Sequence, residues 1–327
     1  MGRSTSKKSF TRDNREGGGH NPEISGRAIV VDSKIGFLGT GLMGLPMAQR
    51  LLAAHVPLVV YNRTVAKLEP LRQAGAAVAA TPADLLQQCQ VVMTMLTDAQ
   101  AIRDLLLSDE AKRQLGDRTV IQMGTIAPSE SRSIQAEIKA AGGEYLEAPV
   151  LGSIPEARDG KLLVMVGAAP AQFQQWLPLL QNLGSEPRWV GEVGTASALK
   201  LALNQLIGSL TTAFALSLGF VQRQGVGVDT FMEILRQSAL YAPTFDKKLQ
   251  RMVDQEFSAA NFPTKHLLKD MNLFWQESEA VGQQADSLTG VRQILEQACQ
   301  MGLAEADYSA LFAAVNPVAA VNPTRDE

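Results

Sequence analysis

Short apolar runs alternate with stretches of helical periodicity through the first half of the chain. The runs combine apolar and β-branched residues, and most end at a polar residue, a proline or a glycine. They cover residues 34–38, 56–61, 91–96, 119–123, 145–148, 162–166 and 188–190. Helical spacing lies between them, over residues 45–54 and 171–183, and Thr81 followed by Pro82 marks another helix start. Alternating strands and helices predict βαβ units and a parallel sheet.

The strand pattern disappears after Thr195 and helical periodicity continues alone. It covers residues 196–224, 229–237, 245–253, 264–281, 288–300 and 308–315. The chain therefore predicts an α/β fold, a Rossmann-type, doubly wound, mostly parallel sheet over residues 34–193. An all-α C-terminal domain follows over residues 194–316, and a long interdomain helix joins the two. Residues 1–33 are predicted to be a disordered extension and residues 317–327 a flexible tail.

One segment of that long helix could be read as a membrane-spanning helix. Residues 201–221 carry no charged side chain and are long enough to cross a bilayer. Asn204, Gln205 and Thr211 interrupt the apolar character, and Lys200 precedes it. A helix that is apolar on all faces is also typical of the centre of a large protein. We expect a buried helix and no membrane partner.

Composition narrows the class of protein. The 327 residues are 46% hydrophobic, which is enough for a substantial core, and the formal net charge is only −3. Nothing in this charge favours a nucleic-acid partner. Cys89 and Cys299 have neither metal-ligand nor redox spacing, so we expect no metal site. Two thiols in a chain of this length fit a reducing compartment and predict a cytoplasmic protein.

A glycine-rich turn follows the first predicted strand and opens the first helix. Gly39, Gly41 and Gly44 form a G-x-G-x-x-G pattern. The first glycine permits the tight turn, the second lets the backbone approach a phosphate, and the third allows close packing of helix on strand. The helix N-terminus adds free N–H groups and a partial positive charge. We predict a dinucleotide site that is formed by Gly39, Thr40, Gly41, Leu42, Met43 and Gly44.

The end of the second strand indicates which dinucleotide binds. NAD-binding proteins place an acidic residue there for the ribose 2′-hydroxyl, but this chain has Asn62, Arg63 and Thr64. A guanidinium with flanking amide and hydroxyl groups suits a phosphate dianion, so we predict NADPH/NADP with Arg63 on the 2′-phosphate. The alternative is that Arg63 is an ordinary solvated surface residue.

The carboxyl ends of parallel strands bind ligands in open α/β sheets. Asn62, Leu96, Thr125 and the loop from Pro149 should therefore surround one crevice. In that loop, the backbone N–H groups around Gly152 and the Ser153 hydroxyl either form an anion nest for a substrate carboxylate or are a simple turn.

Lys200 is the candidate proton donor, one turn into the chargeless helix. Asn204 lies four residues further on, so both side chains project from one face. Desolvation lowers the pKa of a lysine towards neutrality, where a general acid works best. The alternative is that Lys200 extends to the surface at the helix start. The Lys269-Asp270 pair either lies on a solvated face or closes over the cofactor.

These segments together resemble the β-hydroxyacid dehydrogenase family over about residues 34–316. The family includes 3-hydroxyisobutyrate dehydrogenases, tartronate semialdehyde reductases and glyoxylate/succinic semialdehyde reductases. The motifs that carry the resemblance are Gly36-Phe37-Leu38-Gly39-x-Gly41-x-Met43-Gly44, Asn62-Arg63-Thr64, Glu147-Ala148-Pro149-Val150, Gly191-x-Val193-Gly194 with Lys200 and Asn204, and Phe262-Pro263-x-Lys265-His266-x-x-Lys269-Asp270-Met271. The last of these resembles the glyoxylate/succinic semialdehyde reductase branch.

The resemblance implies roles for several residues. It implies Lys200 as the catalytic acid with Asn204 beside it, and a homodimer or homotetramer built around the long helix. It also places Thr125 and Lys269 near the nicotinamide, and Phe262 and Asp270 on the side of a small carboxylate substrate. The chain departs from the family at two positions, with Leu151 where Ser is usual and Gly124-Thr125 where Ser-Thr is usual. Losing a buried, bonded hydroxyl removes about 1–3 kcal/mol, so Leu151 indicates a bulkier or less polar substrate than glyoxylate.

The leading hypothesis is an NADPH-dependent reductase of a small aldehyde or 2-oxo acid, of the glyoxylate/succinic semialdehyde type, with Lys200 as proton donor. The alternative is a 3-hydroxyisobutyrate-type dehydrogenase, in which the same lysine acts as a base. A third possibility is a non-catalytic dinucleotide-binding module, as in animal relatives that are associated with chromatin and lack the lysine. Retention of Lys200 argues against that role and against imine reduction.

Overall fold

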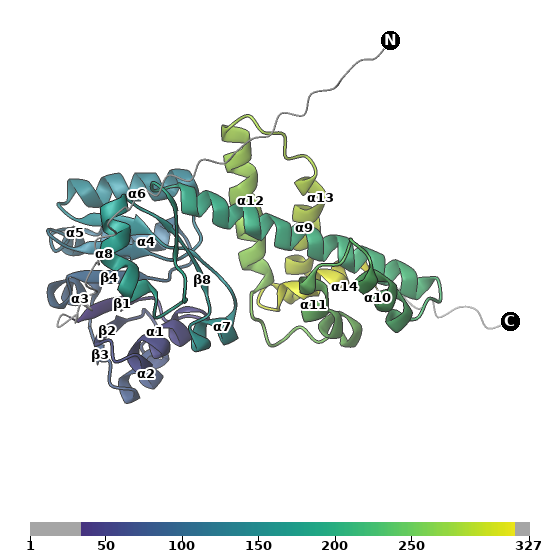
Figure 1. The fold of residues 1–327 in the computed structure, drawn as a ribbon, viewed down its shortest axis with the longest axis horizontal. Coiled ribbons are helices and arrows are strands. Elements are labelled where there is room, and N and C mark those ends of the chain that lie inside the picture. Colours follow the sequence, from purple (N-terminus) through teal and green to yellow (C-terminus); the bar gives the residue numbers. More distant parts are fainter. Residues whose placement is uncertain (1–33, 318–327) are drawn as a thin grey trace, which may run out of the picture. The chain divides into compact units, whose positions relative to one another are not determined.

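The structure is a computed structural model that describes residues 34–317. The predicted extension 1–33 and all but the first residue of the predicted tail 317–327 lie outside the described residues. The elements follow one another along the chain as an α/β part and then a helical part (Figure 1).

A mixed sheet organises the α/β part. Its strands are β1 (Ile35–Leu38), β2 (Leu58–Tyr61), β3 (Ala77–Val78), β4 (Val91–Thr94), β5 (Thr119–Gln122), β6 (Glu144–Glu147), β7 (Val150–Leu151), β8 (Leu163–Gly167) and β9 (Arg188–Gly191). The order is β3-β2-β1-β4-β5-β6-β8-β7, with β9 paired to β8. The strands from β3 to β6 are parallel, whereas β8 is antiparallel to β6 and β7. The predicted doubly wound, mostly parallel sheet is confirmed.

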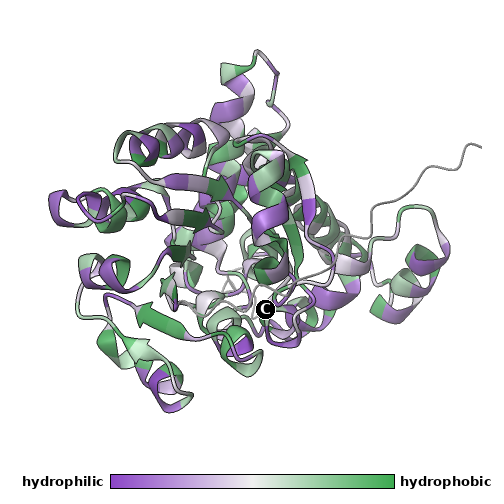
Figure 2. Ribbon diagram, turned by 60° about the vertical axis from the view of Figure 1, so that its left-hand side comes forward, coloured by the Kyte–Doolittle hydropathy of each residue, from purple (hydrophilic) through white to green (hydrophobic). Residues whose placement is uncertain are grey.

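Helices cover this sheet. They are α1 (Gly44–Ala53), α2 (Glu69–Gln73), α3 (Pro82–Gln88), α4 (Ala99–Leu106), α5 (Asp109–Lys112), α6 (Pro128–Ala140), α7 (Ile154–Asp159) and α8 (Pro170–Leu180), with a 3-10 turn at Val65–Leu68. Side chains of one strand alternate between two apolar clusters, since Val91 and Met93 of β4 belong to one and Val92 to the other. Both faces of the strand are therefore buried, which explains the continuous apolar runs in the sequence. Figure 2 shows these strands as predominantly hydrophobic.

The second part is helical, as predicted. It contains α9 (Thr195–Arg223), α10 (Val228–Gln237), α11 (Pro243–Asp254), α12 (Thr264–Ala280), α13 (Leu288–Ala298) and α14 (Leu311–Val315), with a π-turn at Cys299–Leu303 and a 3-10 turn at Tyr308–Ala310. A third apolar cluster, which includes Phe214 and Met271, holds them together. By length and composition α9 could cross a membrane, but one side of it is buried against its neighbours. The helix that was expected to be buried is thus only partly so, because Leu206 and Phe220 are exposed.

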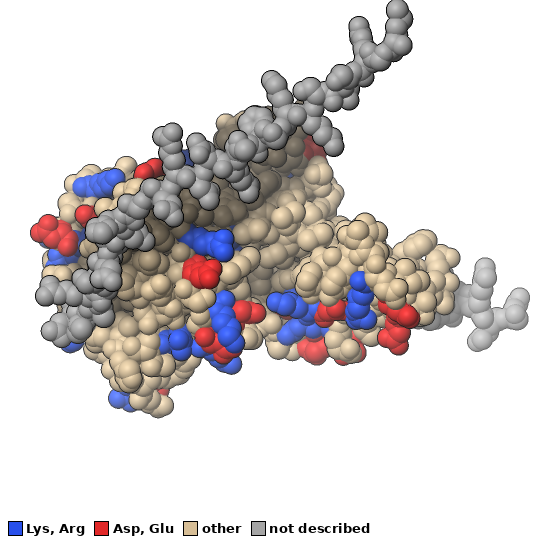
Figure 3. Space-filling model, viewed as in Figure 1, with Lys and Arg blue, Asp and Glu red and all other residues tan. Residues whose placement is uncertain are grey.

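Two elements differ from the expectation. The predicted loop from Pro149 contains the short strand β7 and the helix α7, which begins after Ser153. The strand β3 has only two residues, too few for a period-2 pattern to be visible. On the surface, basic and acidic side chains lie close together on the face shown in Figure 3. Lys247 Nζ, for example, lies 3.8 Å from Glu156 Oε1.

Candidate functional site

The glycine-rich turn has the predicted backbone geometry. Gly39 adopts a φ of +92°, which few other residues tolerate, and a Cβ at Gly44 would overlap the carbonyl oxygen of Gly39. By contrast, nothing lies within 4 Å of the Cβ position at Gly41. The first and third glycines therefore form the turn and its close packing, while the second faces open space.

The end of β2 is tied directly to this turn. The Thr40 backbone N–H donates to Asn62 Oδ1 at 3.2 Å, and Asn62 Nδ2 donates to the Thr64 carbonyl at 3.0 Å. Arg63 and Thr64 are exposed beside this contact. The structure thus brings together the two segments that sequence analysis assigned to the dinucleotide, and the Arg63 side chain is free to meet a group in solvent.

The turn fits a pyrophosphate. The open space at Gly41 would accommodate a phosphate against backbone, at the start of α1 where helix N–H groups gather. The buried Thr40 hydroxyl has no hydrogen-bond partner among the described residues, and a phosphate oxygen would supply one.

The loops after β4 and β5 meet at Lys269 of α12. Lys269 Nζ donates to the Thr97 carbonyl at 2.8 Å and to the Thr125 carbonyl at 2.6 Å. Gly124 is part of the same junction, because a Cβ there would overlap the carbonyl oxygen of Leu96. Gly124, which stands where serine is usual in the family, thus accompanies close contact between these two loops, and Leu96, Thr125 and Lys269 all belong to this junction.

Lys200 is buried on α9. It is 9% exposed, and burial lowers the pKa of its ammonium group to about 8. The negative charge of Asp270 opposes this shift, whereas the positive charge of Lys269 adds to it. Lys200 therefore does not extend to solvent, and near neutral pH its amine both holds a proton and can release it.

Asn204 and Asp270 form the second part of this cluster. Asn204 Nδ2 donates to Asp270 Oδ2 at 2.6 Å, and Lys269 Nζ forms an ion pair with Asp270 Oδ1 at 3.0 Å. Asn204 and Asp270 are both buried, and Asn204 Oδ1 has no hydrogen-bond partner among the described residues. The arrangement links α9 to α12 and leaves one amide oxygen that could accept a hydrogen bond from a substrate hydroxyl.

The residues predicted to bind the substrate are only partly free to do so. Both Ser153 donors, the backbone N–H and the hydroxyl, bind the carboxylate of Glu156, at 2.8 Å and 2.5 Å. Of the two alternatives, an anion nest or a simple turn, the Ser153 donors show a turn that binds a carboxylate of the chain itself, because Ser153 is the N-cap residue of α7 and Glu156 lies in its first turn. Leu151 is half-buried in β7, opposite Leu163 of β8. Phe262 packs edge-on against Tyr308, with ring centroids 5.8 Å apart.

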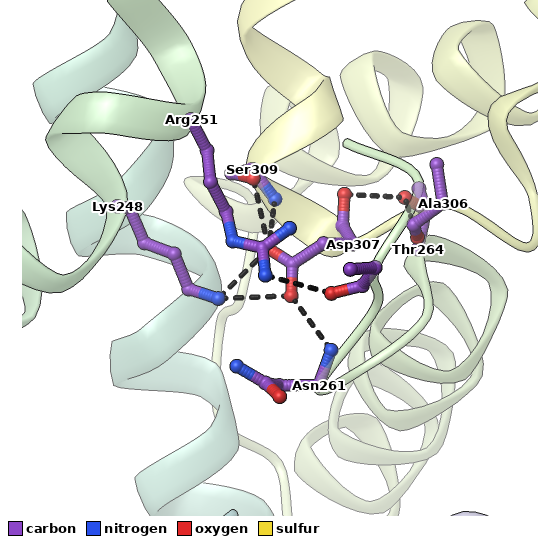
Figure 4. A network of polar contacts seen from close by, with 8 residues as sticks. Lys248, Arg251, Asn261, Thr264, Ala306, Asp307 and Ser309 are labelled. Carbon is purple, nitrogen blue, oxygen red and sulfur yellow. Dashed lines mark hydrogen bonds and ion pairs between the residues drawn. The ribbon is translucent and has the colours of Figure 1, made fainter. Parts of the chain in front are cut away.

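Two buried carboxylates were not identified from sequence as functional. Glu147, at the end of β6, accepts hydrogen bonds from the first turn of α9. Asp307 forms an ion pair with Lys248 at 2.7 Å, deep in the helical part (Figure 4). Glu147 belongs to a family motif but nothing local indicates its partner, which lies 50 residues further on at Ser197, and Asp307 lies 59 residues after its partner Lys248.

Asp307 also fixes the segment that leads into α12. Its carboxylate accepts from the backbone N–H groups of Asn261 and Ser309, each at 3.1 Å, and the Thr264 N–H donates to the Ala306 carbonyl at 2.8 Å. Figure 4 shows these groups converging around Asp307. The start of α12, the helix that carries Lys269 and Asp270, is therefore held by the Asp307 network.

Two family models match the chain almost end to end over the described region. One, described as the NAD binding domain of 6-phosphogluconate dehydrogenase, matches residues 34–192. The other, described as "NAD-binding of NADP-dependent 3-hydroxyisobutyrate dehydrogenase", matches residues 194–315. Fold, glycine turn and models together define an NAD(P)-dependent oxidoreductase.

Curated relatives specify the family. Glyoxylate/succinic semialdehyde reductase 2, chloroplastic, of Arabidopsis thaliana is 31% identical over 283 residues, which is 86% of this chain and 79% of the relative. Reductase 1 of the same plant is 30% identical over 284 residues, 86% of this chain and 98% of the relative. The chain belongs to the β-hydroxyacid dehydrogenase family, as the sequence motifs predicted.

Other similar proteins differ in their described roles. The human cytokine-like nuclear factor N-PAC is 28% identical over 293 residues, 89% of this chain but 53% of that protein. Among solved structures, 3-hydroxyisobutyrate dehydrogenase from Salmonella typhimurium superposes with a TM-score of 0.78 at 22% identity, covering 86% of this chain and 99% of that one. That likeness supports the fold.

Proposed function

We propose that this protein is an NADPH-dependent reductase of a small aldehyde or 2-oxo acid in which Lys200 donates the proton. The observation that carries the proposal is the buried Lys200 amine, with a pKa of about 8, in a cluster with Asn204 and Asp270. Two of the similar proteins are glyoxylate/succinic semialdehyde reductases, which supports an aldehyde or 2-oxo acid substrate.

Residues of both parts of the chain would hold the cofactor. The turn of residues 39–44 would bind the pyrophosphate, Arg63 the 2′-phosphate, and Leu96, Thr125 and Lys269 the nicotinamide end. When bound, the reduced nicotinamide supplies a hydride for the carbonyl carbon of the substrate.

The chain itself supplies the proton. As the C=O bond becomes a C–O single bond, the oxygen retains the electron pair and takes a proton from Lys200 Nζ. The neutral amine then regains a proton from solvent, so one proton is consumed for each carbonyl reduced. Asn204 Oδ1, which is buried without a partner among the described residues, would accept a hydrogen bond from the resulting hydroxyl.

The substrate carboxylate would lie between the loop after β6 and the start of α12, near Leu151, Gly152, Phe262 and Asp270. Because the Ser153 donors already bind Glu156, the carboxylate would depend on backbone N–H groups of this loop. The half-buried Leu151 would favour a substrate longer or less polar than glyoxylate.

The reverse reaction is the second candidate. A pKa of about 8 leaves part of the Lys200 population neutral near pH 7.5, and a neutral amine can remove the proton of a 3-hydroxy acid. In a purely dinucleotide-binding module, by contrast, a buried lysine beside a buried carboxylate would have no reaction to serve.

A homodimer through α9 belongs to the same proposal. Leu199, Leu206, Leu210 and Phe220 are 38% to 64% exposed and lie along one side of this helix. An apolar stripe of this length is typical of an interface, and a second copy of the chain would bury it against the same stripe.

The test is a substrate panel with purified protein. NADPH consumption is measured with glyoxylate and succinic semialdehyde, and NADP⁺ reduction with 3-hydroxyisobutyrate. On the best substrate, Lys200→Ala should lower kcat by about 10²–10⁴-fold, whereas Lys161→Ala, an exposed control, should match wild type. A Lys200→Ala turnover within tenfold of wild type would contradict the proposal.

Arg63→Ala should raise the Kd of NADPH but not of NADH.

A further inference from the structure

A single buried carboxylate joins the sheet to the helix that carries Lys200. Glu147 is fully buried at the end of β6. Its Oε1 accepts from the backbone N–H groups of Gly194 and Ala196 at 2.8 Å and of Ser197 at 3.1 Å. Its Oε2 accepts from the Ser197 hydroxyl at 2.7 Å and also from the Ser131 hydroxyl.

The pocket is shaped for this carboxylate. A Cβ at Gly167 of β8 would overlap the Glu147 carboxylate, so a glycine is needed opposite it. The Ser131 hydroxyl is also within hydrogen-bond distance of the buried Tyr145 hydroxyl, at 2.8 Å. Five donors therefore compensate a buried negative charge that would otherwise be costly to desolvate.

Glu147 replaces the cap that α9 lacks. The N-cap residue is Gly194, which has no side chain, and the first turn contains no acidic residue. Some other helices are capped locally, as α3 is by Thr81 and Asp84 and α4 is by Asp98. A local cap stabilises a helix but leaves its position free, whereas a cap from another element also fixes where the helix begins.

Lys200 lies close to this anchor. It follows Ser197 by three residues, so about 4.5 Å of rigid helix separates the two along the axis. Glu147 also comes two residues before Pro149, where the proposed substrate loop begins. One side chain thus connects the helix of the proton donor with the loop that would bind the substrate.

We propose that Glu147 is a positioning residue that holds Lys200 in register with the substrate and nicotinamide. This inference rests on the proposed function for its catalytic consequence, but its structural part is independent of it. A displacement of about 1 Å at a reacting group can lower a rate by about 10²-fold, so weakening this anchor should act mainly on kcat.

The experiment compares Glu147→Gln with Asp84→Asn, which removes the charge of a capping carboxylate at α3. Glu147→Gln should lower kcat by about tenfold or more and leave the Kd of NADPH within about twofold, and Asp84→Asn should leave both unchanged. In a hydrogen-exchange experiment, the amide protons of residues 194–200 should exchange at least tenfold faster in Glu147→Gln than in wild type, and at the wild-type rate in Asp84→Asn. If Glu147→Gln does not fold, it is replaced by Ser197→Ala, which removes only the hydrogen bond from the Ser197 hydroxyl to Glu147.

A third readout separates this inference from the proposed function. Acetylation of Lys200, followed by mass spectrometry across pH, reports the titration and accessibility of its amine without any turnover. Faster exchange together with altered Lys200 labelling supports the inference even if wild type reduces no substrate of the panel. Unchanged exchange at residues 194–200, or faster exchange with unchanged kcat and labelling in an active enzyme, overturns it.

Discussion

At the scale of single residues, the charge of Lys200 is set by three influences from two helices. Burial within α9 disfavours the ammonium form, Asp270 of α12 favours it, and Lys269 disfavours it. The lysine itself was predictable, because a lone charge at the start of a chargeless helix is visible in sequence. Local spacing did not indicate its partners, since α12 begins 64 residues after Lys200. The family resemblance named Lys269 and Asp270, and the fold brings them to Lys200.

A pH prediction follows from these charges. Reduction needs the protonated amine, so kcat for carbonyl reduction should fall as pH rises through about 8. Asp270→Asn removes the negative charge that raises the pKa of Lys200, so the fall should move to lower pH. Oxidation of the hydroxy acid should show the opposite dependence. The measurement is a pH profile of kcat, with the exposed Asp104→Asn as control, and an identical profile in Asp270→Asn would contradict the role of Asp270.

The glycines allow a matched comparison of two residues. Gly41 and Gly116 both have no atom within 4 Å of the Cβ position and no positive φ. Each change to Ala should therefore leave the melting temperature nearly unchanged. Only Gly41→Ala should weaken NADPH binding, by about tenfold or more, because its methyl group would meet the pyrophosphate. Equal Kd values for NADPH in the two variants, from fluorescence titration, would remove Gly41 from the cofactor site.

At the scale of elements, the Asp307 network determines where α12 begins. Burial alone would raise the pKa of Asp307, but Lys248 and the donors of Ser309 outweigh it and lower this pKa below its usual value. The carboxylate therefore contributes stability above its unfolded pKa and loses it as pH falls through its folded pKa. Lys248 Nζ also lies 4.1 Å from the ring centroid of Tyr308, next to Phe262.

Breaking this buried pair should cost much stability. Asp307→Asn should lower the free energy of unfolding by about 3–5 kcal/mol, because it leaves the Lys248 charge buried without its partner. The double variant Lys248→Met/Asp307→Leu should recover part of the loss. Urea unfolding of both measures the difference, and a cost below about 1 kcal/mol for Asp307→Asn would show that the pair is not what holds this segment.

At the scale of the whole molecule, α9 connects the α/β part with the helical part and presents an apolar stripe. Among the described residues, the side chains of Leu199, Leu206, Leu210 and Phe220 in this stripe are 38% to 64% exposed. Leu206→Lys should therefore reduce the mass of the assembly, measured by light scattering after size exclusion. Val281→Lys, at a position 75% exposed next to the end of α12, should not. A wild-type mass of one chain would contradict the dimer.

Several features of this protein could be predicted from the local order of its residues. The strand–helix alternation, the turn of Gly39, Gly41 and Gly44, the helical second half and the lone lysine of α9 all follow from spacing of a few residues. Family resemblance added the segment that carries Lys269 and Asp270.

Contacts between groups far apart in the chain could be seen only in the folded structure. Glu147 binds the start of α9 across 50 residues, Asp307 binds Lys248 across 59, and Lys269 reaches the Thr97 carbonyl across 172. A carboxylate or a lysine has the same local signature whether it is solvated or buried, so its role depends on the donors and charges that folding places around it. For the same reason Ser153, a candidate for the substrate in sequence, binds Glu156 in the folded chain.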